Sequence, residues 1–90
     1  SKIERVGSAI STEVATKYPD KVIIVLERTD GFYKIHARCQ QGKFHLGRLL
    51  RNMGVGGGHE NAAGGRVKMK ELDDFRERFL KELKLVKSLY

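Results

Sequence analysis

The sequence predicts one small α/β domain, a sandwich in which helices cover a central sheet. Three observations support this prediction. The chain has 90 residues, enough for a single hydrophobic core. Apolar residues recur at helical spacing in some segments and alternate in others. The resulting order is α-β-β-α-(glycine loop)-β-α, which packs as helices against a few strands.

The first half predicts a helix followed by a β-hairpin. Residues 2–17 carry apolar side chains at helical spacing, and Pro19 ends this helix. The apolar run 22–26 is typical of a strand covered on both faces and therefore central in its sheet. Asp30-Gly31 predicts the hairpin turn, and residues 32–39 alternate. The apolar helix positions are Ile3, Val6, Ile10 and Val14; one face of the second strand holds Tyr33, Ile35, Ala37 and Cys39, and the other holds Phe32, Lys34, His36 and Arg38.

The second half predicts two more helices with a strand between them. A loop over 40–43 leads to a helix over roughly 45–53, and Gly54 stands where a left-handed cap would end it. After the glycines, residues 66–70 alternate and predict a short strand near a sheet edge. A long helix over about 71–88 closes the chain. Its apolar positions are Leu72, Phe75, Phe79, Leu83 and Val86.

Composition and charge indicate which kinds of binding partner and cellular environment suit the chain. The net charge is +7, which favours polyanions such as nucleic acid, although a basic surface that only keeps the domain soluble explains the charge equally well. There is no run of 18 apolar residues, so we expect no membrane span. The single cysteine, Cys39, excludes an internal disulfide and fits a reducing, cytoplasmic environment. It falls on the apolar strand face, which indicates a core residue more than a nucleophile.

The segment 54–65 is the most unusual stretch, because half of its residues are glycine. Its composition favours a binding loop over a flexible linker. The backbone N–H groups of three glycines could converge on an anion, and Asn61 or Glu60 could open a helical turn through the following alanines. His59 could donate to a phosphate or only brace the loop. The residues concerned are Gly56, Gly57, Gly58, Ala62, Ala63 and Gly64.

Known nucleotide-binding loops do not match this stretch. A Walker A loop needs Gly-Lys-Ser/Thr after the glycines, where this chain has His59-Glu60-Asn61. A dinucleotide fingerprint follows a strand, whereas this stretch follows a predicted helix. The three histidines lie on different elements and lack zinc-ligand spacing, so we expect no metal site. No base, nucleophile or paired carboxylates stand out, and the chain is predicted to bind without catalysing.

One strand residue could assist the glycine stretch. Arg38 and His36 share a strand face, and an arginine on a rigid strand can hold a phosphate with two hydrogen bonds. By spacing alone, an exposed strand arginine with a surface ion pair is the simpler interpretation.

The glycine stretch carries a resemblance to a known family. Residues 56–65 read Gly-Gly-Gly-His-Glu-Asn-Ala-Ala-Gly-Gly and match a GGGHxxAAG signature. The chain thereby resembles the DHH-associated C-terminal domain of the Asp-His-His phosphoesterase superfamily, which includes RecJ-type exonucleases, nano-RNases and cyclic-dinucleotide phosphodiesterases. The predicted hairpin, helix, strand and closing helix are similar too, so the resemblance covers nearly the whole chain.

The resemblance implies a division of labour. It implies that residues 1–90 are a single substrate-binding domain of a longer hydrolase, whose N-terminal domain binds manganese ions and cleaves the phosphodiester. This chain alone would then be inactive. Arg38 stands at the position of a family arginine that assists the glycine motif, in His36-Ala37-Arg38-Cys39. The family often has serines at the positions of His36 and Cys39, so the resemblance supports a substrate contact at Arg38 more directly than one at His36.

The resemblance implies substrate contacts at Arg38, Gly56, Gly57, Gly58, His59, Asn61, Ala62, Ala63 and Gly64, with single-stranded nucleic acid, a short oligonucleotide or another phosphodiester as ligand. Two alternatives stay open. One is a stand-alone KH-like module, in which Gly54-Val55-Gly56-Gly57 acts as a GxxG loop. The other is an architectural domain whose glycines only make tight turns.

Overall fold

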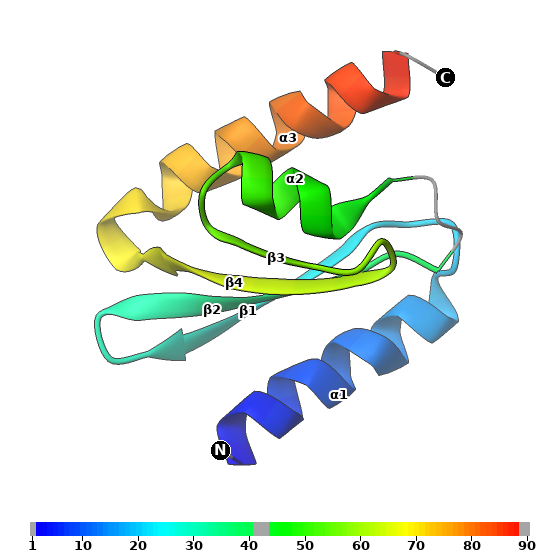
Figure 1. Cartoon of the computed structure of the whole chain (residues 1–90). Coiled ribbons are helices and arrows are strands. Elements are labelled where there is room, and N and C mark those ends of the chain that lie inside the picture. The colour runs from blue at the N-terminus through cyan, green and yellow to red at the C-terminus, as the bar shows by residue number, and fades with distance from the viewer. Residues whose placement is uncertain (1, 41–43, 89–90) are drawn as a thin grey trace.

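A four-stranded antiparallel sheet with helices on both faces forms the domain (Figure 1). The computed structural model describes residues 2–40 and 44–88. The predicted α/β sandwich is confirmed, with one strand more than expected. Residues 41–43 of the predicted loop lie outside the described part, as do the side chains of Ile3, Val6 and Val86. The elements are α1 (Lys2–Lys17), β1 (Ile23–Thr29), β2 (Phe32–Arg38), α2 (Leu46–Asn52), β3 (Gly56–Gly58), β4 (Ala62–Lys68), the 3-10 turn η1 (Met69–Glu71) and α3 (Leu72–Ser88).

The strand order is β1-β2-β4-β3, and it corrects two predictions. The apolar strand β1 lies at an edge and not at the centre. It is apolar on both sides because α1 packs on one face while Ile24 and Leu26 join the core on the other. The strand predicted over 66–70 near an edge is β4, which begins at Ala62 and lies between β2 and β3.

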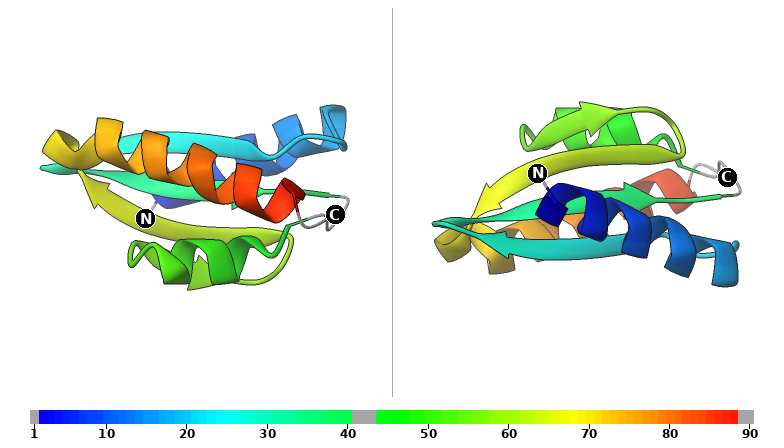
Figure 2. Two further views of the ribbon diagram at one scale, coloured as in Figure 1. Left: turned by 90° about the horizontal axis from the view of Figure 1, so that it is seen from above. Right: turned by 90° about the horizontal axis from the view of Figure 1, so that it is seen from below.

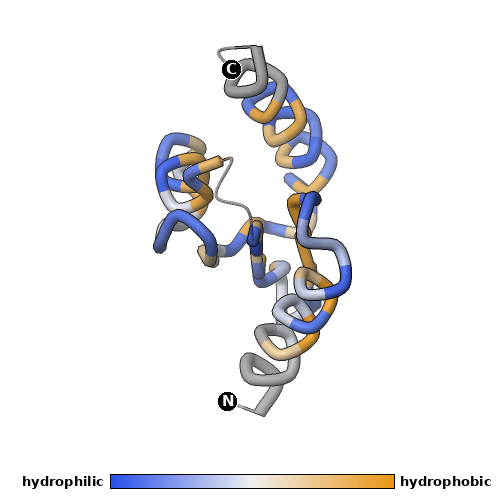
Figure 3. The backbone as a smooth tube through the Cα atoms, turned by 90° about the vertical axis from the view of Figure 1, so that its right-hand side faces the viewer, coloured by the Kyte–Doolittle hydropathy of each residue, from blue (hydrophilic) through white to orange (hydrophobic). Residues whose placement is uncertain are grey.

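The core fills the face of the sheet that carries α2 and α3. The predicted alternation of β2 is confirmed, because Ile35, Ala37 and Cys39 are buried. Figure 3 shows apolar and polar residues alternating along α3, as expected for a helix with one side on the core. The buried hydrophobic cluster consists of Ile35, Ala37, Cys39, Leu46, Leu49, Leu50, Met53, Ala63, Val67, Phe75 and Phe79.

Helix α1 covers the opposite face with a side that the sequence did not predict. Ile10, placed on the apolar side by its spacing, is 45% exposed. The side that faces the sheet carries Gly7, Ser11 and Ala15, all buried. Small residues let the helix approach the strands closely. A Cβ at Gly7 would collide with side-chain atoms of Glu27 and His36.

Two glycines take left-handed backbone angles where the sequence predicts turns. Gly31 has φ 78° in the hairpin between β1 and β2. Gly54, with φ 74°, ends α2 as predicted. The N–H of Gly54 bonds the carbonyl of Arg51 at 3.0 Å, and that of Val55 bonds Leu50 at 3.1 Å. This pair of bonds is a Schellman cap, and it turns the chain directly into β3.

Candidate functional site

The glycine stretch folds as a β-hairpin rather than as a loop. Residues 56–58 form β3, and β4 follows after three residues. The helical turn predicted through Ala62-Ala63 is therefore wrong, because both alanines belong to β4. The predicted convergence of three glycine N–H groups is not met either, since successive N–H groups of a strand point to opposite sides.

The tip of this hairpin is tied to its neighbours by backbone hydrogen bonds. The carbonyls of three consecutive tip residues accept bonds of 2.9–3.0 Å from the start of α2 and the end of β2. These bonds occupy the first N–H groups of α2, so that helix end is not available to a ligand. The pairs are Gly47 N–H to His59, Leu46 N–H to Glu60 and Cys39 N–H to Asn61.

Four glycines are required by close backbone packing. A Cβ at any of them would overlap backbone atoms of a neighbouring segment. Gly57 differs, because the nearest atom to its Cβ would be Nε of Arg51 at 3.8 Å, an ordinary contact. Gly64 would meet only the carbonyl of Ile35, at 3.2 Å. The fold thus explains Gly47, Gly56, Gly58 and Gly65. It leaves Gly57 unexplained, and at Gly64 a Cβ would make a tight contact with a backbone carbonyl.

Arg38 lies where β2 ends, against the first residues of β4. Its Nη1 donates to the carbonyls of Ala37 at 2.8 Å and Ala63 at 3.4 Å, and its Nε donates to Thr12 Oγ1 of α1 at 3.4 Å. Burial lowers the pKa of the Arg38 guanidinium below its ordinary value. The guanidinium stays charged at neutral pH and is held in a partly dehydrated place.

A cleft of about 340 Å³ opens beside Arg38. Its walls come from α1, the end of β2 and the start of β4. The structure therefore brings together Arg38, Asn61 and Ala62, three of the residues predicted to bind substrate. The other lining residues are Thr12, Ala15, Cys39 and Gln40.

His36 shares the strand face of Arg38, as predicted, but it has a partner inside the protein. Its Nε2 donates to Oε1 of Glu27 on β1 across 2.8 Å, and each side chain is 12% exposed. The other carboxylate oxygen of Glu27 is buried without a hydrogen-bond partner among the described residues. This geometry supports a bracing role for His36 beneath α1.

Part of this same sheet face is left open. Helix α1 packs on β1 and β2 and lies to one side of β4 (Figure 2). Along β4 the exposed positions on this face are Gly64, Arg66 and Lys68. In register they pair with His36, Lys34 and Phe32 of β2. On this open face, exposed Gly64 thus lies between the cleft at Arg38 and the basic side chains of Arg66 and Lys68.

His59 lies at the exposed hairpin tip, and its backbone N–H donates to the carbonyl of Ala62 at 2.8 Å. It does not line the cleft beside Arg38. Arg66 is not among the predicted site residues. It lies over the ring of Phe32, with its Cζ 4.7 Å from the ring centroid. The alternation of residues 66–70 already predicted that Arg66 and Lys68 share a face, and this signal could have found it.

Neither a metal-ligand cluster nor a membrane-spanning helix occurs among the described residues. No three His, Cys, Asp or Glu side chains among residues 2–40 and 44–88 gather where they could hold a metal ion. The helices in that part of the chain are too short or too polar to cross a membrane.

A family model for the DHHA1 domain, a DHH-associated domain, matches residues 4–85. The chain belongs to this family. The match covers the hairpin motif, Arg38 and most of both terminal helices. No curated protein sequence matches the chain significantly. The family and the fold argue against the KH-like alternative, because the last two glycines of the candidate GxxG loop, Gly56 and Gly57, belong to strand β3 and do not lead into a helix.

Proposed function

We propose that this DHHA1 domain grips the phosphate backbone of a single-stranded oligonucleotide for a DHH phosphodiesterase. The observation that carries the proposal is the open half of the sheet face, where exposed Gly64 lies between Arg38 and Arg66. Glycine lets a ligand approach the strand backbone, and the flanking guanidinium groups supply positive charge.

Arg38 is the principal phosphate contact in this proposal. Its guanidinium already lies against two carbonyls, so little side-chain entropy is lost when a phosphate binds. Partial burial strengthens its attraction to an anion, because the local dielectric constant is lower than in water. Asn61 and Ala62 line the same cleft, and His59, at the exposed hairpin tip, would contact the ligand outside it.

Hydrolysis belongs to another domain in this proposal. The described residues do not fit a manganese site, since no metal-binding cluster occurs among them. A DHH catalytic domain, joined in the same polypeptide and active in the cytoplasm, would supply the metal ions and the reaction. The DHHA1 domain would hold the substrate across the interdomain cleft.

Titration of the 90-residue chain with a fluorescent pentanucleotide, followed by amide chemical-shift mapping, tests this proposal. We expect Arg38→Ala to weaken binding about tenfold, the loss typical of one charge-assisted contact. Arg76→Ala is the matched control, because Arg76 is an exposed arginine on α3, far from this face in the fold. Its affinity should equal that of the wild type.

The chemical-shift map gives an independent criterion. Perturbations should concentrate on Arg38, residues 57–64 and Arg66. Equal losses for the two arginine variants, or shifts spread over α3, would show that the oligonucleotide binds through diffuse charge and would contradict the proposal. Unchanged affinity after combining Arg38→Ala with His59→Ala would leave the glycines with an architectural role only.

A further inference from the structure

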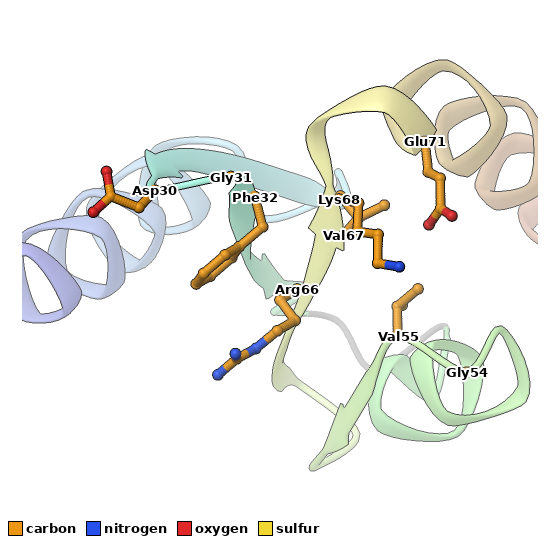
Figure 4. A pocket seen from close by; sticks show the side chains of 9 residues that line it. All are labelled: Asp30, Gly31, Phe32, Gly54, Val55, Arg66, Val67, Lys68 and Glu71. Atoms are coloured by element: carbon orange, nitrogen blue, oxygen red, sulfur yellow. The ribbon is translucent and has the colours of Figure 1, made fainter.

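A second feature lies at the far end of the open sheet face. Figure 4 shows Arg66 and Phe32 projecting side by side from β4 and β2. The guanidinium lies over the aromatic ring, with 4.7 Å between Cζ and the ring centroid. Phe32 is half-buried and Arg66 is exposed, so the ring supports the inner side of the guanidinium while its outer side faces solvent.

The surroundings of this pair hold charges of both signs. The pair lines a hollow of about 550 Å³, whose lining residues also include Lys68 and the acidic residues Asp30 and Glu71. Carboxylates repel phosphate but accept hydrogen bonds from the amino groups of bases. Guanidinium planes are common stacking surfaces for unpaired bases.

The distance from Arg38 sets the size of ligand that reaches both places. Arg66 pairs in register with Lys34, four residues before Arg38 on β2. Four strand residues span about 13 Å. A single nucleotide does not cover that length, whereas a short oligonucleotide laid along β4 past Gly64 does.

We infer that the Arg66–Phe32 pair is a base-stacking site for a nucleotide beyond the phosphate held at Arg38, which makes oligonucleotides of three or more nucleotides the preferred ligand. The inference rests on the proposed function and deepens it. Phosphate recognition at Arg38 would not depend on the base sequence of the ligand, and stacking at Arg66 would favour ligands long enough to reach it.

Length-dependent binding of Arg66 variants tests the inference. We compare the affinities of a dinucleotide and a pentanucleotide for the 90-residue chain. Arg66→Lys keeps the charge and loses the planar group, and we expect it to weaken pentanucleotide binding roughly tenfold while dinucleotide binding stays unchanged. Phe32→Leu keeps an apolar side chain beneath Arg66 and should weaken only the pentanucleotide as well.

An oligonucleotide that lacks some of its bases separates the contribution of base stacking to affinity from that of charge. On a pentanucleotide with abasic sites at its last three positions, wild type and Arg66→Lys should bind equally. If Arg66→Lys binds the intact pentanucleotide as the wild type does while Arg66→Ala binds it more weakly, Arg66 contacts only phosphate and the stacking site is refuted. Equal weakening of both ligand lengths refutes it too. Indifference of both lengths to Arg38→Ala would instead overturn the proposed function.

Discussion

His36 has two candidate roles, a contact with substrate and a hydrogen bond that braces Glu27, and the two can be tested separately. Spacing placed His36 beside Arg38 as a possible substrate contact, whereas the structure pairs it with Glu27 under α1. We expect His36→Ala to lower the free energy of unfolding by about 1–3 kcal/mol, because it leaves a buried carboxylate with no hydrogen-bond donor. Oligonucleotide affinity should change little. Urea denaturation and fluorescence titration measure the two quantities.

The double variant is the control for this pair. Adding Glu27→Ala to His36→Ala removes the stranded carboxylate, so the combined loss of stability should be smaller than the sum of the single losses. A His36→Ala protein with wild-type stability and tenfold weaker binding would instead make His36 a substrate contact.

At the scale of elements, the packing of α2 against β3 depends on Gly47. A Cβ there would overlap the backbone of Gly58. Alanine is the better helix former by about 1 kcal/mol, so propensity alone predicts that Gly47→Ala stabilises the protein. We expect the opposite, a net loss of about 1–3 kcal/mol, because neither backbone can move without breaking the bond from Gly47 N–H to His59. Thermal or urea denaturation measures it.

Gly57→Ala is the matched control within the same pair of elements. Its Cβ would make only ordinary contact with the flexible end of Arg51, so stability should stay within about 0.5 kcal/mol of the wild type. Comparable losses for both variants would mean that the hairpin tolerates no side chain anywhere. A stable Gly47→Ala protein would show that α2 and β3 can separate at little cost.

The same two elements show where sequence reasoning stopped. Gly54 was recognisable as a helix cap, because a left-handed glycine after an apolar periodicity is a local signal. The strands at Gly56–Gly58 and Ala62–Gly65 were not, since glycine and alanine carry no strand propensity. Their extended form comes from pairing: β4 pairs with β2, and β3 pairs with β4. Hydrogen bonds from α2 to the hairpin tip hold the two strands in place, and the bonds to β2 and α2 are contacts between separate parts of the chain.

At the scale of the whole molecule, the alternation of apolar and polar residues predicted which face of a strand is buried, but not which strands lie next to one another in the sheet. Residues 32–39 divided correctly into a core face and a polar face, because a strand has one simple period. The strand order was wrong at β1 and β4, since coverage by helices makes an edge strand as apolar as a central one. The cleft at Arg38 joins Thr12, Arg38 and Asn61, and sequence spacing does not encode that proximity.

The charge of the whole domain gives a last prediction, because a local site and a diffuse basic surface respond differently to salt. For single-stranded nucleic acid, the slope of log affinity against log salt is about −0.7 for each phosphate neutralised. If the open face acts alone, about three phosphate contacts, at Arg38, Lys34 and Lys68, give a slope of about −2. Full use of the net charge of +7 would give about −5. Measuring pentanucleotide affinity between low and physiological salt distinguishes binding at the open face from binding through the charge of the whole domain. Arg38→Ala should make the slope shallower by about 0.7, and Arg76→Ala should leave it unchanged. A slope near −5, or one that the two arginine variants alter equally, would mean that charge spread over the domain holds the ligand.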